Sequence, residues 1–598
     1  MISGTILHRL RDWALTSPEA PAQSYKSEKG IWKTLSAQEY YERTQSLAYY
    51  LESEGFGEKD IGAIFSYNCK EWPQTELAMG LIRMKCVGLY PNSVTKEVHY
   101  ILNHTQASLI AVQNEEYFKK LVLEGYQIPA CVRKIIVFEG KADFSPLAIS
   151  FEEVLKRGRS LMSAKNINTY LERLDVHEPA FLIYTSGTTG NPKGAMLSHD
   201  NLVFASDLVI KRWQLPFQSG SLFSFLPMCH IAEQLHSVGV GISQRYLTYY
   251  CTKFDNVSTE LLEAEPTLLL CVPRVWEKMM EKVQLTISHA PLMRKALATW
   301  AIWQGGDKMK SKFEDRSRGR IAQVADFLAA QLVLSKVRKK MGLGRATILA
   351  SGAAPLPAHV SRWFRSIGLE ILECYGMTET TAVISITLPG KDCAGTVGKP
   401  LDGCEFKFAP DGEIWTKGRH IFLGYYKDPE NTAATLEDGW LKTGDLGEWT
   451  KEGYVKIRGR KREIMKTSGG KMIAPVPIEE QLKVAEFISQ VCLVGDNRKY
   501  LSALITLAEG TLKQLNDKKA KIEKGLIIDQ EILTKVKAEI ARVNQSLSSY
   551  EQVKKFAVLD REFSIVEGEM TPTMKMKRST IESRFKTVID GFYAAEDV

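Results

Sequence analysis

Short apolar, β-branched runs recur along the N-terminal part of the chain, and longer stretches with helical spacing separate them. The runs are IGAIFS (61–66), ASLIAV (107–112), KIIVF (134–138), AFLIY (180–184), TLLLCV (267–272) and ATILAS (346–351). Continuous apolar runs of this length are typical of parallel strands that are buried on both faces. The pattern therefore predicts an α/β architecture in which helices cover parallel sheets.

The C-terminal part of the chain has a different pattern. After about residue 385, turns rich in Gly and Pro separate short runs such as EFKFA (405–409), which predicts a small antiparallel barrel or sheet. From about residue 460, the runs VCLVG (491–495), LSALIT (501–506) and FAVL (556–559) flank a Lys-rich helical stretch at 511–543. This block predicts a separate small α+β domain.

Length and composition indicate a multidomain globular protein. At 598 residues the chain is too long for one hydrophobic core, and 44% hydrophobic with 25% charged residues is typical of soluble proteins. No apolar run approaches the roughly 18 to 20 residues that span a bilayer, and the start has no secretory-signal pattern. The 10 cysteines lie singly, so we expect reduced thiols in the cytoplasm rather than disulfides or structural zinc.

One segment, residues 294–345, accounts for the net charge of +8, because it holds 13 Lys/Arg and only 4 Asp/Glu. A solvated basic helical surface is one interpretation. Peripheral association with an anionic membrane face, or with a polyanionic ligand, is the other. Nucleic acid is not expected, since nothing resembles a zinc finger, an RNP motif or a basic zipper.

The stretch YTSGTTGNPKGAMLSH (184–199) is a candidate phosphate loop. Glycines let the backbone N–H groups of a loop converge on one anion, and hydroxyls and Lys193 add donors and positive charge. It follows an apolar run, where α/β folds place ligand loops. On composition alone, a flexible surface turn is the alternative. The loop is not a Walker A motif, because Gly194 follows Lys193 and neither Gly-Lys-Ser/Thr nor GxGxxG occurs in the chain.

Further motifs follow in order, and with this loop they resemble the adenylate-forming superfamily of acyl-CoA synthetases, luciferases and peptide-synthetase adenylation domains. The RGRK form of 458–461, the 272–279 motif and the basic insert after it are most similar to the long-chain fatty acyl-CoA synthetase branch. The motifs are LPMCHIAE (226–233), VPRVWEKM (272–279), SGAAPLP (351–357), ECYGMTET (373–380), GWLKTGDLG (439–447), RGRKRE (458–463) and TPTMKMKR (571–578).

The resemblance implies a fold and a reaction. The fold is a large N-terminal domain, residues 1–458, of two parallel-type αβ subdomains plus a small β-barrel, followed by a mobile α+β C-terminal domain, residues 459–598. In the reaction, a fatty acid carboxylate attacks the α-phosphorus of ATP, releasing pyrophosphate and giving acyl-adenylate. The thiol of coenzyme A then displaces AMP. Repulsion between the two anions in the first step calls for positive charge and Mg²⁺.

The resemblance also assigns roles to residues. Glu379 and Thr185 would hold Mg²⁺, and the loop that ends at Lys193 would wrap the β- and γ-phosphates. Asp445 would bind the ribose with help from Arg460, and His230 would lie near the carboxylate, although a lone histidine is often structural. The other residues implied to bind nucleotide are Ser186, Gly187, Thr188, Thr189, Gly190, Gly352, Ala353, Ala354, Glu373, Cys374, Tyr375, Gly376, Met377 and Thr378.

Lys575 resembles the lysine that bridges carboxylate and α-phosphate during adenylation. Most relatives have glycine before this lysine, whereas here Met574 precedes it and Lys577 remains the alternative. Gly459 stands where many relatives have an acidic residue, and we expect the C-terminal domain to rotate about it. Rotation would replace Lys575 with a coenzyme A face formed by Gly469, Gly470 and Lys471.

Two other functions remain open at this stage. An adenylating ligase could pass its acyl group to acyl carrier protein or act on another hydrophobic acid. A catalytically silent relative could bind lipid or serve as a scaffold. The presence of Glu379, Asp445 and Lys575 argues against a catalytically silent protein. The leading hypothesis is a long-chain fatty acid:CoA ligase.

Overall fold

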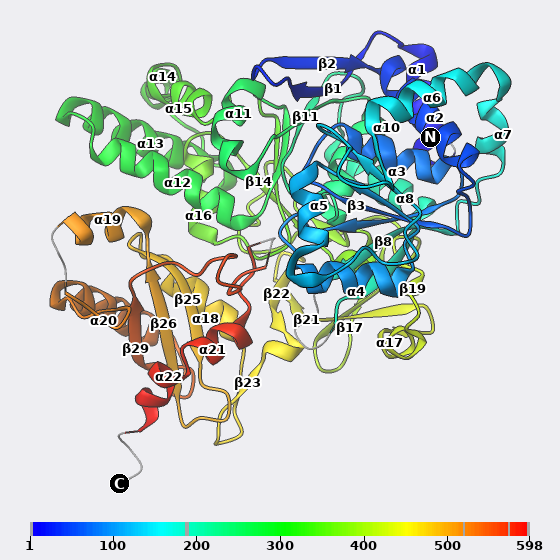
Figure 1. Cartoon of the computed structure of the whole chain (residues 1–598). Coiled ribbons are helices and arrows are strands. Elements are labelled where there is room, and N and C mark those ends of the chain that lie inside the picture. Colours follow the sequence, from blue (N-terminus) through cyan, green and yellow to red (C-terminus); the bar gives the residue numbers. More distant parts are fainter. Residues whose placement is uncertain (1–3, 186–190, 518–520, 572–573, 595–598) are drawn as a thin grey trace.

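The structure is a computed structural model that describes residues 4–185, 191–517, 521–571 and 574–594 (Figure 1). Its first large sheet follows the strand order β19-β9-β8-β4-β3-β5-β6-β7, with parallel pairing from β8 to β7. Four of the predicted runs form its buried strands. The strands are β3 (Ile61–Phe65), β4 (Lys85–Leu89), β5 (Leu109–Val112), β6 (Lys134–Val137), β7 (Ala148–Ser150), β8 (Pro179–Thr185), β9 (Lys193–Ser198) and β19 (Gly424–Tyr425).

The second large sheet follows the order β16-β15-β14-β13-β12-β10-β11-β1-β2 and is parallel from β14 to β1. The two predicted runs at 267–272 and 346–351 form its central strands. Its far edge comes from the N-terminus, where β1 pairs with β11. The strands are β1 (Pro21–Lys26), β2 (Trp32–Ser36), β10 (Ser221–Ser224), β11 (Leu247–Tyr250), β12 (Leu268–Cys271), β13 (Ile348–Ser351), β14 (Ile371–Tyr375), β15 (Ser385–Ile386) and β16 (Lys399–Pro400).

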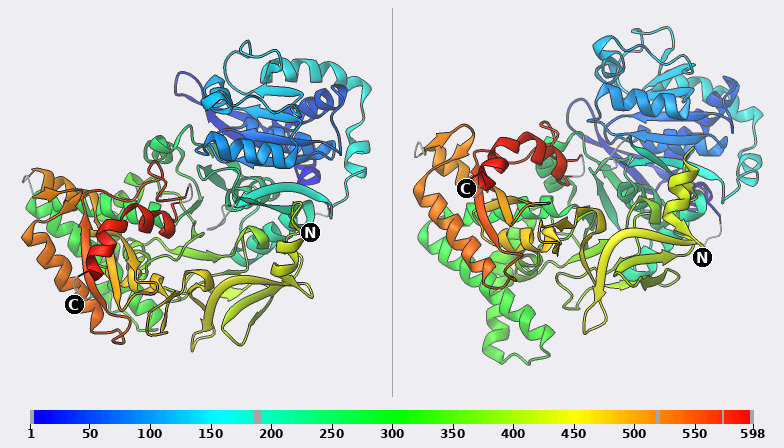
Figure 2. Two further views of the ribbon diagram at one scale, coloured as in Figure 1. Left: turned by 60° about the horizontal axis from the view of Figure 1, so that its bottom comes forward. Right: turned by 90° about the horizontal axis from the view of Figure 1, so that it is seen from below.

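Helices cover these sheets, as Figure 2 shows from two directions. A capping box at Ser36 starts α2, and another at Ser198 starts α8, which directs the chain from sheet to helix. The helices are α1 (Ile6–Thr16), α2 (Ala37–Ser53), α3 (Glu71–Leu81), α4 (Thr95–Thr105), α5 (Glu115–Leu121), α6 (Phe151–Leu161), α7 (Ile167–Glu172), α8 (His199–Trp213), α9 (Ile231–Glu233), α10 (Gly241–Gln244), α11 (Val257–Ala264), α12 (Pro273–Ser288), α13 (Leu292–Phe313), α14 (Arg320–Ala329), α15 (Ser335–Lys340) and α16 (Ala358–Ser366).

The change of pattern after residue 385 corresponds to a small antiparallel half-barrel. Its strands follow the order β17-β18-β21-β20, and β22 also pairs with β21. The predicted α/β class, with two mainly parallel sheets and a small β-unit, is confirmed. The elements are β17 (Glu405–Phe408), β18 (Glu413–Lys417), α17 (Pro429–Thr435), β20 (Leu436–Glu437), β21 (Trp440–Trp449) and β22 (Val455–Arg460).

The last block is the predicted small α+β domain, built on a sheet in the order β25-β26-β29-β28-β27 with its own apolar core. In Figure 1 it lies beside α12 and α16. The predicted boundary at 458/459 falls inside β22, so the strand that ends at Arg460 leads directly into this domain. Its elements are β23 (Met465–Lys466), β24 (Met472–Ile473), α18 (Pro475–Leu482), β25 (Ile488–Val494), β26 (Leu501–Leu507), α19 (Glu509–Asp517), β27 (Ile522–Glu523), β28 (Leu526–Ile527), α20 (Gln530–Asn544), β29 (Val553–Leu559), α21 (Arg578–Arg584) and α22 (Lys586–Tyr593).

Candidate active site

A buried carboxylate, Asp445, forms one side of the site. The register of β21 and β22 places Asp445 opposite Arg460, whose Nε lies 3.0 Å from Asp445 Oδ1. The hydroxyl of Tyr375, at the end of β14, donates to Asp445 Oδ2 at 3.0 Å. Two donors therefore orient Asp445, whose carboxylate is of the kind that can accept hydrogen bonds from ribose hydroxyls.

Glu379 and Lys193 form a second group, which Tyr425 joins. Glu379 is buried in a short 3₁₀ turn (Thr378–Thr380), and the Tyr425 hydroxyl donates to its Oε1 at 2.6 Å. The Lys193 ammonium lies 5.4 Å from the centre of the Tyr425 ring and also donates to Asn431. Thr185 pairs with Lys193 across the β8–β9 hairpin. The Glu379 carboxylate, the Lys193 ammonium and the Tyr425 hydroxyl therefore lie together at the base of the predicted phosphate loop.

The remaining residues of that loop, Ser186, Gly187, Thr188, Thr189 and Gly190, lie outside the described residues. Across the residues that the structure describes, no group of three or more His, Cys, Asp or Glu side chains gathers for a metal. Mg²⁺ requires only one or two carboxylates when phosphates and water complete its shell. Glu379, a carboxylate beside the loop, fits that requirement.

Lys575 reaches this site from the C-terminal domain. Burial and the charge of Arg460 lower the pKa of Lys575 to about 8, while Asp445, Glu463 and Glu379 act in the opposite direction. Its ammonium therefore lies near both carboxylates of the site. Lys577 is instead exposed and precedes α21. Of the two lysines in the motif, the structure brings Lys575 to the site.

Met574, the residue before Lys575, has a backbone conformation that suits glycine. Its φ is +59°, in the left-handed region, where glycine is tolerated and other residues are strained. The Met574 side chain packs against an apolar cluster of the N-terminal part and against one of the C-terminal domain. The residue before Lys575 therefore keeps a glycine-like backbone conformation although it carries a large side chain.

His230 lies next to this lysine at the start of α9. Burial and the Lys575 ammonium lower the pKa of His230 to about 3, so the imidazole is neutral at pH 7. Its Nδ1 accepts from the Ala232 N–H at 3.2 Å. Because Nδ1 is an acceptor, the ring proton of the neutral imidazole belongs on Nε2, which can donate to a carboxylate.

The predicted adenine segments meet between β13 and β14. Gly352, Ala353 and Ala354 follow β13, and Ala353 has φ +70°. Glu373 accepts from the Leu356 N–H at 3.3 Å, which links β14 to the loop after β13, and burial raises the pKa of Glu373 to about 8. The rest of the predicted set continues along the same strand and turn: Cys374, Tyr375, Gly376, Met377 and Thr378.

The predicted coenzyme A residues do not join this group. Gly469, Gly470 and Lys471 form the exposed turn between β23 and β24, and the Lys471 ammonium faces the Tyr550 ring at 5.6 Å. Gly459 has φ +151°, a conformation that L side chains rarely adopt. In the structure, Lys575 rather than the Gly469–Lys471 turn therefore lies near Asp445 and Glu379.

Sequence reasoning missed Tyr425 and Glu463. Tyr425 lies on a two-residue strand outside the quoted motifs, and only its pairing with β9 brings it to Glu379. Glu463 stands in the RGRKRE motif, but its proximity to Lys575 depends on the fold of the C-terminal domain, to which both residues belong. No periodic pattern in the sequence indicates either contact.

Comparison with known proteins agrees with this arrangement. Residues 10–426 match the family described as AMP-binding enzyme, and residues 462–597 match AMP-binding enzyme C-terminal domain. The chain is 31% identical over 605 residues to the human long-chain-fatty-acid–CoA ligase ACSBG2, covering 96% of this chain and 90% of that protein. It is also 31% identical to the long-chain-fatty-acid–CoA ligase FadD15 of Mycobacterium bovis, covering 95% of this chain and 93% of that protein.

Solved structures with similar folds have lower identity. The A-PCP didomain of a carboxylic acid reductase from Segniliparus rugosus, in complex with AMP, has a TM-score of 0.75 at 19% identity and covers 100% of this chain and 83% of its own. The anthranilate CoA ligase AuaEII, in complex with anthranoyl-AMP, has a TM-score of 0.73 at 16% identity, with 97% of each chain covered. At these identities the likeness concerns the fold. The two family matches and the curated relatives establish that this chain belongs to the AMP-binding enzyme family.

Proposed function

We propose that this protein is a long-chain fatty acid:CoA ligase that forms AMP. The observation that carries the proposal is that Lys575 of the C-terminal domain lies near His230 and near the carboxylates Glu379 and Asp445. Both relatives named above are long-chain-fatty-acid–CoA ligases, which supports the substrate class. ATP, a fatty acid and coenzyme A are the substrates under this proposal.

In the first half-reaction, a carboxylate oxygen attacks the α-phosphorus, and the bond from that phosphorus to the bridging oxygen of pyrophosphate breaks. The Lys575 ammonium would lie between the two anions and offset the charge that develops as they approach. His230 Nε2–H would orient the carboxylate, and Asp445 would hold the ribose. Lys193 would bind the departing phosphates. When bound at Glu379, Mg²⁺ would add positive charge at the phosphates.

In the second half-reaction, the thiol sulfur attacks the acyl carbon. The bond from the acyl carbon to the AMP oxygen breaks, AMP leaves, and the thiol proton passes to solvent. Lys575 must withdraw so that the thiol can approach. We propose that the domain from residue 459 onward rotates about Gly459 and brings the Gly469, Gly470 and Lys471 turn to the site.

Single-turnover assays of Lys575→Ala test the proposal. Acyl-adenylate formation from ATP and palmitate should fall by roughly a thousandfold, since one positioned charge in a dry site contributes several kcal/mol. Thioester formation from supplied palmitoyl-adenylate and coenzyme A should persist. Lys577→Ala is the matched control and should retain both steps. Normal adenylation by Lys575→Ala would refute the assignment.

The acyl acceptor separates this proposal from its nearest rival. A ligase for acyl carrier protein would form the same adenylate from the same residues. Incubating the enzyme, ATP and palmitate with either coenzyme A or acyl carrier protein distinguishes the two. We expect the thioester on coenzyme A, and transfer to the carrier protein alone would favour the rival.

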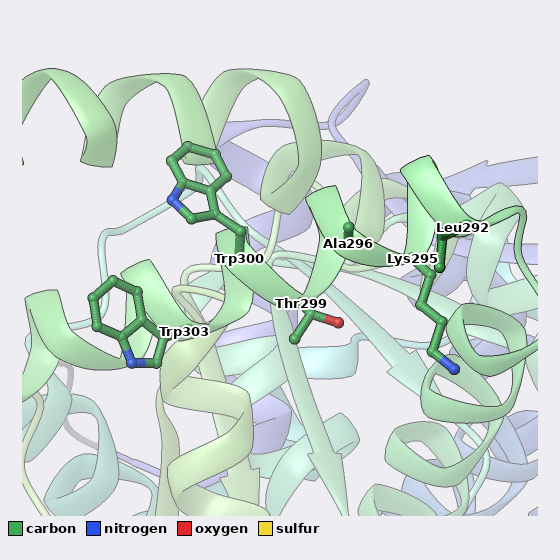
Figure 3. Close-up of a pocket in the computed structure, with 6 residues that line it drawn as sticks. All are labelled: Leu292, Lys295, Ala296, Thr299, Trp300 and Trp303. Carbon is green, nitrogen blue, oxygen red and sulfur yellow. The ribbon is translucent and has the colours of Figure 1, made fainter.

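We further propose peripheral membrane association through the basic segment 294–345. Helices α13 and α14 expose large apolar side chains, with Met293 85% and Ile321 89% accessible. On α13, a shallow groove of about 610 Å³ is bordered by apolar side chains and a lysine (Figure 3). Such apolar patches mark interaction surfaces. The six lining residues are Leu292, Lys295, Ala296, Thr299, Trp300 and Trp303.

Charge favours an anionic bilayer as the partner of this surface. Arg318 pairs with both Asp307 and Asp326, so one guanidinium engages two of the segment's four acids. Lys308 and Arg320 are exposed and form no ion pair with the residues that the structure describes. No helix in the described ranges has the length and apolar character needed to cross a membrane. Basic residues among exposed apolar ones suit binding at the lipid surface.

Sedimentation with vesicles tests this association. We expect binding to vesicles that contain phosphatidylglycerol, weaker binding as salt is added, and little binding to pure phosphatidylcholine. The double variant Lys308→Glu, Arg320→Glu should bind less, whereas Lys29→Glu, a change at an exposed lysine outside the basic segment, should not matter. Equal binding to both vesicle types would contradict the electrostatic argument.

A further inference from the structure

Helix α12, which carries the 272–279 motif, presents two different faces. Val275, Trp276 and Met280 are buried in an apolar cluster of the N-terminal part. A second face, at helical spacing, carries the charged residues, and it contacts the C-terminal domain. The charged residues are Arg274, Glu277, Lys278 and Glu281.

Two cations of this face converge on one carboxylate of the C-terminal domain. Glu562 Oε1 lies 2.7 Å from Arg274 Nη2 and 2.8 Å from Lys278 Nζ. Arg274 also donates to the Ser489 hydroxyl at 2.6 Å, and Ser489 donates to Glu562 at 2.5 Å. These contacts tie α12 to β25 and to the segment after β29.

In a third ion pair the charges are reversed, because the cation belongs to the C-terminal domain and the anion to α12. Lys483, at the end of α18, places its ammonium 2.9 Å from Glu277 Oε1. Their side chains are only 16% and 8% exposed. Burial alone would raise the pKa of Glu277, but Lys483 and Arg274 outweigh it and hold that pKa at about 2. Each ion also has a partner in its own domain, Arg274 for Glu277 and Glu480 for Lys483, and the interdomain pair joins the two sets into one buried network.

We propose that Arg274, Glu277 and Lys278, together with Lys483 and Glu562, form an interdomain ion cluster that fixes the C-terminal domain where Lys575 reaches the active site. These five are positioning residues, since they act through Lys575. The proposal rests on the proposed function, in which that domain must later move away.

Ion pairs suit a contact that forms and breaks in every cycle. When the domains separate, water solvates the released charges, so the cost of opening is far smaller than the Coulomb energy of the buried pairs. A matched apolar interface would gain free energy on closing with no such compensation on opening. Losing one partner while the domains remain closed leaves a buried charge with one counter-ion fewer and no access to water, which specifically penalises the closed arrangement.

A double-mutant cycle of Lys483→Met and Glu277→Gln tests the ion cluster. Each single variant should form palmitoyl-adenylate from ATP and palmitate at least tenfold more slowly than the wild type. The double variant should lose less than the product of the two single losses, because both charges of the Lys483–Glu277 pair are then removed together. Thioester formation from supplied palmitoyl-adenylate and coenzyme A should be unchanged or faster in all three, which also shows that both domains are folded.

Lys282→Met is the matched control, since Lys282 lies on the same helix, is exposed, and forms no ion pair with the described part of the chain. It should leave both half-reactions unchanged. Equal losses of both half-reactions in the single variants, or strictly multiplicative losses in the double variant, would overturn the ion cluster as a positioning device. Failure of the proposed function is a separate result, namely a wild-type enzyme that forms no adenylate from any fatty acid.

Discussion

Replacing Lys575 with methionine should stabilise the ligand-free protein at neutral pH while abolishing adenylate formation. In the structure, the C-terminal domain buries this ammonium in the nucleotide site, with Arg460 close by. In the ligand-free protein, Asp445, Glu463 and Glu379 offset only part of the lost hydration. Methionine keeps the apolar stem and removes the charge, so it isolates the cost of burying the ammonium.

The size of this effect follows from the pKa of Lys575, which falls from its ordinary 10.5 to about 8. One pKa unit corresponds to about 1.4 kcal/mol, so the charged form carries a penalty of at most about 3 kcal/mol. Binding of ATP and a fatty acid would bring two anions beside the ammonium and remove that penalty. The same charge that destabilises the free enzyme would then stabilise the transition state.

Urea unfolding of the wild type and of Lys575→Met between pH 7 and pH 10.5 measures the penalty. Because the pKa is lower in the folded than in the unfolded state, the unfolded chain binds more protons between about pH 8 and 10.5, and wild-type stability rises across that window. The variant should therefore be more stable by up to about 3 kcal/mol at pH 7, and the difference should vanish near pH 10.5. A difference that does not change with pH would refute the reasoning.

Three further predictions follow from individual contacts. Met574→Gly should retain about fivefold more adenylation activity than Met574→Ala. Both variants lose the interdomain packing, but only glycine relieves the left-handed backbone strain of about 1 kcal/mol. Equal adenylation rates of the two variants would contradict this. Gly459→Ala should slow adenylation about fivefold, since φ +151° disfavours a side chain, and an unchanged single-turnover rate would show that this conformation is not required. Tyr425→Phe removes the hydroxyl that orients Glu379 and should raise the Mg²⁺ concentration for half-maximal pyrophosphate release by roughly tenfold; an unchanged Mg²⁺ titration would exclude that role.

The parallel sheets could be predicted because their strands are continuous apolar runs. Residues 61–66 and 180–184 become β3 and β8, buried between helices, and no tertiary information is needed to recognise such runs. The strands β1 and β2 were not predicted. They are short and partly polar, and they are strands because β1 pairs with β11, more than 200 residues away.

The candidate site could be assembled from the motifs only in part. Asp445 and Arg460 belong to neighbouring motifs, and strand register brings them together. Tyr425 and the α12 ion cluster depend on contacts between distant segments, which leave no local pattern. The spacing 274, 277, 278, 281 does mark a charged helical face in retrospect, although a charged face alone more often meets solvent than a partner domain.

The most direct test of the proposed function is pyrophosphate release measured with a panel of carboxylic acids of increasing chain length, with and without coenzyme A. The account predicts ATP-dependent pyrophosphate release with long-chain fatty acids, limited to about one turnover without coenzyme A. With coenzyme A, turnover should continue and yield AMP and acyl-CoA in equal amounts. Release with short acids only, or adenylate formation without any acyl-CoA product, would contradict it.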